Sequence, residues 1–257
     1  MKKLSILFMA FAMFIQVNAQ EEKKPVIKQM LLTPHPEKIM EFRKNLAEHN
    51  QKFHPKGKYD VTVYEIETGK DAGKYIWAMR TDSYDDLENS PSGADHKAHW
   101  DSKVVSTLKT HPQVALWRLQ LDRSSFVKQF DHKYVRVRFF DFKEIDEAYK
   151  HFNDMQRKFS AVQNKFSIRN EGYYTSAFTY DNFHVAIVNF KEKLDRDQSW
   201  NWDAFTEKYK EMFGEELNEE TSKKYEETIK EMKMELWKFD EELSTQSPTI
   251  MVVKNQK

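Results

Sequence analysis

The chain repeats one succession of segments, and this repeat limits the possible folds more than any other feature. Residues 39–53 read IMEFRKNLAEHNQKF and residues 145–159 read IDEAYKHFNDMQRKF, with Ile, Glu, Lys and the final Lys-Phe in common. Both segments place apolar side chains at helical spacing, so each is expected to form an amphipathic helix. A strand-like run precedes each helix, VIKQMLL at residues 26–32 and YVRVRFF at residues 134–140.

Matching segments also follow the two helices. Each half continues with two runs rich in β-branched and aromatic residues, which favour strands, and then with a second helical region. Each half ends on a strand that carries a Leu-Trp-cation triplet: Leu116, Trp117 and Arg118 in the first, Leu236, Trp237 and Lys238 in the second. The sequence therefore predicts two copies of a β-α-β-β-α-β unit, at residues 26–122 and 132–240.

One such unit would leave a sheet face uncovered, because both of its helices pack on the other face. The bare face would be an apolar patch large enough to demand a partner. Two covalently joined copies can press their bare faces together or close them into a barrel, so we predict an α+β fold of two tandem ferredoxin-like units. The chain is expected to be a monomeric pseudo-dimer, and the sequence leaves a further homodimer open.

The C-terminal tail, residues 241–257, lies outside the repeats. It contains a short apolar run at residues 250–253. This run either adds an edge strand to the same molecule, which is the favoured interpretation, or docks on a partner chain.

This organisation resembles the dimeric α/β-barrel superfamily of ferredoxin-like proteins, in a tandem, single-chain form. That group includes antibiotic-biosynthesis-type monooxygenases, haem-degrading monooxygenases and, with haem bound, chlorite-dismutase-like enzymes. The resemblance covers residues 26–122 and 132–240 and rests on the element order and the repeated triplet, not on a catalytic motif. It implies that the two tandem ferredoxin-like units form a pseudo-dimeric α/β barrel, with a cavity between two sheets. It leaves haem as an option, whereas the residues themselves predict no cofactor.

The first 19 residues have the composition of a cleaved signal peptide. A basic start at Lys2 and Lys3 precedes an apolar run from Leu4 to Ile15, and Ala19 ends the segment. About a dozen apolar residues are too few for a hydrocarbon core that needs roughly twenty, so we expect no membrane span in the mature chain. The protein is therefore expected to be exported, either to a periplasm or out of the cell.

Composition and the missing motifs exclude several classes of function. The chain has no cysteine, which removes disulfides, thiolate nucleophiles and cysteine-ligated metals. Lys plus Arg and Asp plus Glu number 41 each, so no net field recruits nucleic acid. There is no Gly-rich phosphate loop, no GxSxG and no GxGxxG after a strand, which leaves nucleotide hydrolysis, common esterase chemistry and Rossmann cofactor binding without support.

Alternation along residues 134–140 suggests where a ligand could bind. We expect Val135, Val137 and Phe139 to pack under helices, since strand side chains alternate between two faces. The opposite set would then point between the sheets, where cations could grip an anionic, flat ligand. The predicted ligand-binding residues are Tyr134, Arg136, Arg138 and Lys238. The alternative is a structural ion network in which Glu65, Glu171 or Asp240 pairs with the arginines.

The histidines supply a weaker signal. His184 lies in an apolar run and could face the cavity as a ligand-binding group, a catalytic acid or base, or a haem ligand, although a hydrogen-bonded core histidine is more common. His96 and His99 stand three apart on a predicted helix and could share a metal with a third ligand. No metal-binding motif accompanies them, so no metal site is expected. The remaining histidines, among them His49, His54, His132 and His151, form no recognisable constellation.

Three functions remain open. The favoured one is an exported protein that holds a small aromatic or anionic molecule between two sheets without turnover. The alternative is a cofactor-free or haem-handling monooxygenase-like enzyme, with His184, Arg136 and Arg138 as participants. A module for protein-protein interaction in the cell envelope is the third. The sequence does not decide whether the protein is an enzyme.

Overall fold

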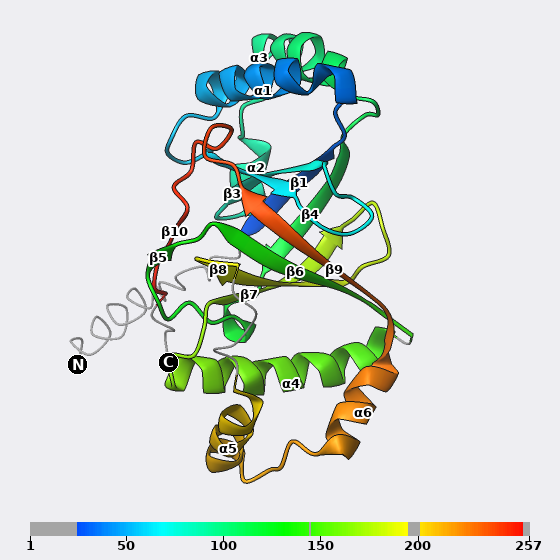
Figure 1. Cartoon of the computed structure of the whole chain (residues 1–257), viewed down its shortest axis with the longest axis vertical. Helices are drawn as coiled ribbons and strands as arrows, with labels where there is room; N and C mark the ends of the chain where they lie inside the picture. The colour runs from blue at the N-terminus through cyan, green and yellow to red at the C-terminus, as the bar shows by residue number, and fades with distance from the viewer. Residues whose placement is uncertain (1–24, 144, 195–200, 254–257) are drawn as a thin grey trace, which may run out of the picture.

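The computed structural model describes residues 25–143, 145–194 and 201–253. Within these ranges, eight antiparallel strands close into a barrel, and the longer helices lie outside it (Figure 1). The α+β class and the barrel are therefore as predicted. The signal-peptide segment, residues 1–19, lies outside the described residues. No helix among the described residues is both long and apolar enough to cross a membrane.

The first half of the chain supplies four barrel strands and the helices above them. Its longest helix, α1, spans the same residues that the repeat predicted. The elements in chain order are β1 (Val26–Leu32), η1 (Pro36–Lys38), α1 (Ile39–Phe53), β2 (Val61–Ile66), β3 (Tyr75–Thr81), α2 (Tyr84–Glu88), α3 (Ala94–His99), η2 (Trp100–Val104), η3 (Val105–Thr107) and β4 (Gln113–Leu119).

The second half supplies the other four barrel strands. Its first helix, α4, is longer than its counterpart α1 and crosses the opposite side of the barrel (Figure 1). The elements are η4 (Leu121–Arg123), β5 (Phe130–Asp131), β6 (Tyr134–Phe142), α4 (Ile145–Lys165), β7 (Glu171–Phe178), β8 (Val185–Lys191), α5 (Trp202–Phe213), α6 (Glu219–Thr228), β9 (Ile229–Phe239) and β10 (Thr249–Ile250).

The strand order around the barrel is β1-β3-β2-β9-β6-β8-β7-β4, and β4 returns to β1. The two halves meet at two seams, β2 with β9 and β4 with β7. Both repeated triplets lie on seam strands: Trp117 is on β4 and Trp237 is on β9, where it pairs with Ile66 of β2. The repeated tryptophan therefore marks the two strands through which each half joins the other.

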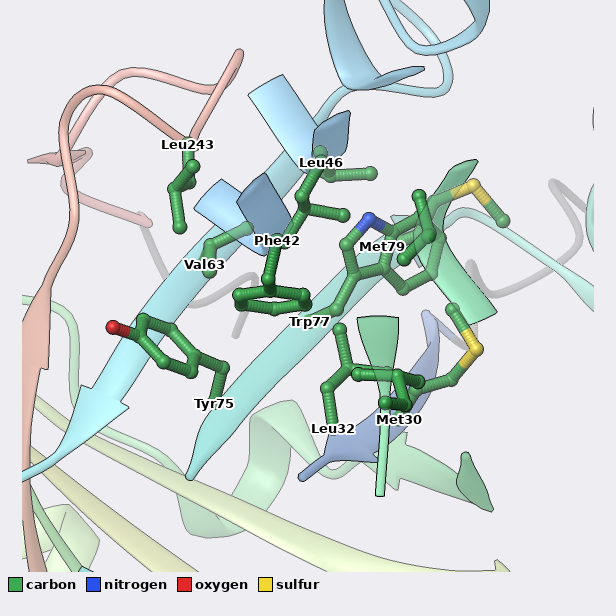
Figure 2. Close-up of a cluster of buried hydrophobic side chains, with 12 residues drawn as sticks. Met30, Leu32, Phe42, Leu46, Val63, Tyr75, Trp77, Met79 and Leu243 are labelled. Carbon is green, nitrogen blue, oxygen red and sulfur yellow. The ribbon is translucent and has the colours of Figure 1, made fainter. Parts of the chain in front are cut away.

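The barrel separates an inner core from outer cores under the helices. Figure 2 shows the outer core beneath α1, where Phe42 and Leu46 of the helix meet the fully or nearly fully buried Trp77 and Met79 of β3. A second outer core lies beneath α4 and contains Phe140, Phe142, Phe152, Tyr173, Val185 and Ile187. Among the described residues, the helix side of the barrel is thus filled by close-packed apolar side chains in both outer cores.

The structure reverses the predicted faces of β6. Val135, Val137 and Phe139 point into the barrel, whereas Phe140 packs against Phe152 of α4, with ring centroids 5.0 Å apart. The prediction was wrong because alternation defines two faces but not which one the helix covers. The helix side accepts the intervening Arg138 because Glu171 lies there as its partner.

The tail forms a strand on the same molecule, which confirms the favoured interpretation. Its short strand β10 pairs antiparallel with β5, with Thr249 opposite Asp131 and Ile250 opposite Phe130. The tail thereby crosses from the end of β9 back to the segment that links the two halves, along one side of the barrel (Figure 1).

Candidate functional site

The barrel interior contains a cavity of about 270 Å³. Inward-facing residues of all eight barrel strands line it, and the tail contributes a further wall. Most of the lining is apolar or aromatic. The polar side chains in it include Gln29, Thr62, Arg80, His132 and Gln246. A mainly apolar cavity with few polar groups is the arrangement that small-molecule sites commonly have.

Both repeated tryptophans form part of the cavity wall. The ring of Phe139 lies between them, with its centroid 5.9 Å from Trp117 and 6.0 Å from Trp237. The Trp237 indole donates its Nε1–H to Glu235 Oε2 at 2.9 Å. By contrast, Trp117 is 3% exposed and its Nε1–H has no acceptor among the described residues. One of the residues that line the cavity therefore carries a buried hydrogen-bond donor without an acceptor among the described residues.

A buried tyrosine and histidine form a second polar element of the wall. His132 Nδ1 contacts the Pro248 carbonyl oxygen, which only accepts, so Nδ1 carries the proton. His132 Nε2 then accepts the hydroxyl proton of Tyr64 across 2.9 Å. Burial lowers the pKa of His132, and burial together with nearby Tyr174 raises the pKa of Tyr64. The pair is therefore neutral at pH 7 and can relay a proton between a bound molecule and the imidazole.

Tyr174 borders the same cavity, and its position depends on a glycine. A Cβ placed on Gly172 would lie only 2.7 Å from Tyr174 Cε2 and 3.0 Å from its hydroxyl oxygen. Glycine is thus the residue that lets the tyrosine ring fold back along strand β7. Burial raises the pKa of Tyr174 to about 12, against the opposing charge of Arg80. The Tyr174 hydroxyl is therefore un-ionised at neutral pH.

Hydrogen bonds fix the tail across the cavity, in addition to the pairing of β10 with β5. Thr62 Oγ1 donates to Gln246 Oε1 at 2.6 Å, and the Val253 amide donates to the Phe126 carbonyl oxygen at 3.0 Å. Between these points Met251 is 61% exposed.

None of the five predicted ligand-binding residues is among the described residues that line the cavity. Arg138 Nη2 donates to Glu171 Oε2 at 3.4 Å, and Arg136 Nη2 donates to Asn189 Oδ1 at 3.2 Å, both beneath α4. Arg138 therefore takes part in the ion network that was the alternative interpretation. Lys238 is exposed, and in the strand register it lies beside Tyr134.

His184 also lies away from the cavity. It directly precedes β8, and its Nδ1 is 3.2 Å from Asp141 Oδ1. The structure thus supports neither the convergence of His184 with the two arginines nor its position in the cavity wall.

The cavity does not fit a haem. His132 is the histidine of its described lining, and both of its ring nitrogens are engaged, one by Tyr64 and one by Pro248. Neither nitrogen is left to ligate iron. His184, for which haem ligation was one of the options considered from the sequence, lies outside the lining. We therefore assign no chemical step to haem.

Most of the residues that line the cavity were not predicted from the sequence. Tyr64, His132 and Tyr174 belong to three separate segments, and only the closed barrel brings them together. The repeated triplet did contain a usable signal, because it marked Trp117 and Trp237.

Outside the barrel, the structure also gathers histidines: one ring nitrogen each from His49, His54 and His96 lies within 4.8 Å of the other two.

Comparison with known proteins identifies the fold. No model of a known protein family matches the chain, and no curated protein has a significantly similar sequence. Among solved structures, a candidate monooxygenase from Lactobacillus acidophilus superposes with a TM-score of 0.56 and 14% identity, covering 90% of this chain and 100% of that chain. A candidate monooxygenase from Fusobacterium nucleatum gives 0.56 and 10%, covering 91% and 98%.

A second group of similar structures consists of chlorite dismutases. A mutant chlorite dismutase from Candidatus Nitrospira defluvii superposes with a TM-score of 0.52 and 8% identity, covering 87% of this chain and 94% of that chain. At such identities the similarity shows the fold alone. The chain therefore has the fold of the dimeric α+β-barrel proteins, the superfamily that its repeated element order resembles, without assignment to one family within it.

Proposed function

We propose that the protein binds a small, flat, mainly apolar molecule inside the barrel, through an acceptor atom that takes the Nε1–H of Trp117. The observation that carries this proposal is the cavity of about 270 Å³ with one unsatisfied buried donor in its aromatic wall. Pockets for drug-sized ligands span roughly 300–1,000 Å³. A volume just below that range suits a molecule of one or two fused rings.

The cavity's polarity restricts the ligand further. Its aromatic walls, including Trp117, Phe139 and Trp237, favour a ring system that stacks or meets them edge to face. Arg80 is the charged side chain among the described residues that line the cavity. It is exposed, so water can solvate its charge and the ligand does not need to carry a counter-charge. A neutral ligand with one carbonyl or ring-nitrogen acceptor therefore fits better than a fully ionic one.

A matched pair of probes tests this proposal. 1-Indanone and indane share a bicyclic frame, but only 1-indanone carries a carbonyl acceptor. The substitution Trp117→Phe keeps an aromatic ring and removes the N–H. Calorimetric titration should show about a 5-fold loss of affinity for 1-indanone, from a hydrogen bond worth about 1 kcal/mol, and no loss for indane.

Two outcomes would refute the proposed contact. If neither probe binds the folded wild-type protein, the cavity is not a binding site for molecules of this size. If Trp117→Phe weakens both probes equally, the indole acts through packing and not through its N–H. Trp100→Phe, outside the barrel, is the matched control and should leave both affinities unchanged.

We propose turnover of the bound molecule as the second candidate function, because the Tyr64 and His132 pair lies in the cavity wall. A hydroxyl proton of the ligand would pass to the Tyr64 oxygen while Tyr64 passes its own proton to His132 Nε2. The ligand anion left behind would be the reductant and dioxygen the oxidant. The similarity of the fold to candidate monooxygenases is in line with this. An oxygen electrode tests it: His132→Gln should abolish ligand-dependent oxygen consumption while probe binding persists. Oxygen consumption that survives this substitution would exclude the pair.

We infer that the barrel consists of two tandem ferredoxin-like units, residues 26–122 and 132–240. The strand orders β4-β1-β3-β2 and β9-β6-β8-β7 support this, since corresponding strands occupy corresponding places in the two halves. We further propose export, on the strength of residues 1–19. Peptide mapping of the mature protein should find Gln20 at its N-terminus, and an intact Met1 on the mature protein would contradict export by cleavage.

A further inference from the structure

Four histidines gather between α1 and α3, on the outer side of the barrel. His49 lies on α1 and His54 directly follows it, while His96 and His99 lie one turn apart on α3. Figure 1 shows the two helices side by side at the end of the molecule away from α4. This cluster takes no part in the barrel cavity. It unites the pair predicted on one helix with two histidines for which the sequence suggested no role.

The hydrogen bonds of His54 determine where its lone pair points. His54 Nδ1 lies 3.1 Å from the Tyr59 carbonyl oxygen, which only accepts, so Nδ1 carries the proton. The lone pair is therefore on Nε2, which faces His96 Nε2 at 3.2 Å. A backbone carbonyl that holds the far nitrogen of a histidine is the arrangement that orients histidine ligands in metal sites.

His49 supplies the second sign of a ligand site. Its side chain is fully buried, and its Nε2 has no hydrogen-bond partner among the described residues. Its Nδ1 lies 3.2 Å from His99 Nδ1. A buried polar atom without a partner is uncommon in a native protein, because its desolvation is not repaid. A bound cation would satisfy it.

The distances suit a metal ion. A tetrahedral zinc ion holds its ligand nitrogens at about 2.0–2.1 Å, which places neighbouring nitrogens about 3.4 Å apart. Here the three candidate nitrogens of His49, His54 and His96 lie within 4.8 Å of one another, and one of the pairs is at 3.2 Å. Small side-chain rotations would close the set around one ion.

The protonation states suit a metal as well. Burial and the neighbouring imidazoles lower the pKa of His49 to about 3 and that of His54 to about 4. Burial also lowers the pKa of His96. All three are therefore neutral at pH 7, and a metal can bind their lone pairs without first displacing protons.

We propose that His49, His54 and His96 bind one transition-metal ion of the zinc class, with His99 beside the Nδ1 of His49. Neutral imidazoles favour zinc, copper or nickel, whereas calcium and magnesium require oxygen ligands. The ion would tie α3 to the end of α1. Aromatic rings pack around the site, with Trp100 at 5.0 Å from His49 and Trp77 at 5.2 Å from His54 between ring centroids.

One neighbour opposes the ion. Lys28 of β1 acts on His54 and His96 by its charge, and its own pKa is lowered by burial. A positive charge that acts on these histidines would also repel a cation bound between them. Lys28→Met should therefore tighten metal binding several-fold.

The test uses the untagged full chain, stripped with a chelator and titrated with Zn²⁺ against a chromophoric competitor. We expect one equivalent to bind, and Co²⁺ in its place to give the visible absorption of a four-coordinate site. His96→Gln removes the least buried of the three ligands, so its effect on folding should be smallest. Its affinity should fall by more than the roughly 10- to 100-fold that loss of an outer-shell partner costs.

His111→Gln is the matched control, since His111 is an exposed histidine of a loop and is not among the candidate ligands. It should bind Zn²⁺ as the wild type does. Circular dichroism confirms that each variant is folded. The proposal is overturned if the folded wild type takes up no stoichiometric metal, or if His96→Gln binds as tightly as the wild type. The first outcome would leave the cluster as a set of histidine-histidine hydrogen bonds.

Discussion

Replacing Glu171 with glutamine removes a buried negative charge that pairs with cations and accepts hydrogen bonds beneath α4. The Glu171 carboxylate is buried and accepts hydrogen bonds from Arg169 Nη2 and Gln156 Nε2, both at 2.8 Å. Arg138 Nη2 approaches it at 3.4 Å, and Asn189 also donates to it. Glutamine has nearly the same shape but no charge, so the substitution isolates the electrostatic part of the network.

The size of the effect follows from the pKa of Glu171. Burial alone would raise that pKa, but the charges of Arg169 and Arg138 and the amide hydrogen bonds bring it from 4.5 down to about 2. At about 1.4 kcal/mol per pH unit this corresponds to about 3 kcal/mol in favour of the folded state. Breaking a buried ion pair costs about 3–5 kcal/mol. We expect the lower end, since the two arginine side chains are 23% and 25% exposed.

The sign of the pH dependence is also determined. A carboxyl group whose pKa is lowered by folding stabilises the protein above its unfolded pKa, and this contribution is lost as the pH falls through the folded pKa. The contribution of Glu171 should therefore be complete above about pH 5 and vanish towards pH 2. Glu171→Gln should be less stable than the wild type at pH 7, and the difference should shrink on acidification.

Urea unfolding followed by tryptophan fluorescence, at pH 7 and at pH 3, measures both quantities. Glu88→Gln, on an exposed position of α2, is the control and should change the free energy of unfolding by less than about 0.5 kcal/mol. A Glu171→Gln protein within about 1 kcal/mol of the wild type at pH 7 would refute the reasoning. So would a difference that stays constant between the two pH values.

Three further substitutions probe the cavity and the outer core. Ala186→Leu projects a larger side chain into the cavity and should abolish binding of 1-indanone without lowering the melting temperature. If the free energy of unfolding instead falls by about 1–3 kcal/mol, as it does when a filled core is overpacked, the space is not open. Gly172→Ala should displace the Tyr174 ring, visible as shifted tyrosine signals in NMR spectra, and unchanged signals would contradict the close approach. Phe42→Ala, at a fully buried position of α1, should lower the free energy of unfolding by about 3–5 kcal/mol in urea, and a loss under 1 kcal/mol would show that the site collapses to fill the gap.

The element order could be predicted because it is written twice in local patterns. The helix expected at residues 39–53 is α1, and the helix expected at residues 145–159 is the first part of α4. The repeated triplets fall on β4 and β9. These features depend on residues that are close in the sequence, so periodicity and β propensity suffice to find them.

The orientation of β6 could not be predicted in the same way. Its two alternating sets of side chains differ clearly in polarity: one contains Val135 and Val137, the other Arg136 and Arg138. Burying the apolar set under a helix was the simpler prediction. The barrel interior is the more apolar side here, because Glu171 on β7 supplies a partner for Arg138 on the helix side. That compensation depends on a tertiary contact that periodicity does not report.

The histidine cluster escaped prediction for a related reason. His96 and His99 share a helix, and their spacing was noted. His49 and His54 lie earlier in the chain, separated from that helix by β2, β3 and α2. Only the packing of α3 against α1 brings the rings together. Sites assembled from distant segments carry no local spacing signal, whereas the i, i+3 pair on one helix does.

The measurement that tests the central claim most directly is the mass of the protein purified from its own host, recorded under native and under denaturing conditions. We predict that the wild-type protein carries a small molecule that is released on unfolding, and that Ala186→Leu, purified in the same way, carries none. A wild-type chain at its sequence mass in both conditions, with no uptake of 1-indanone, would contradict ligand binding in the barrel. It would leave the interaction module as the function to test.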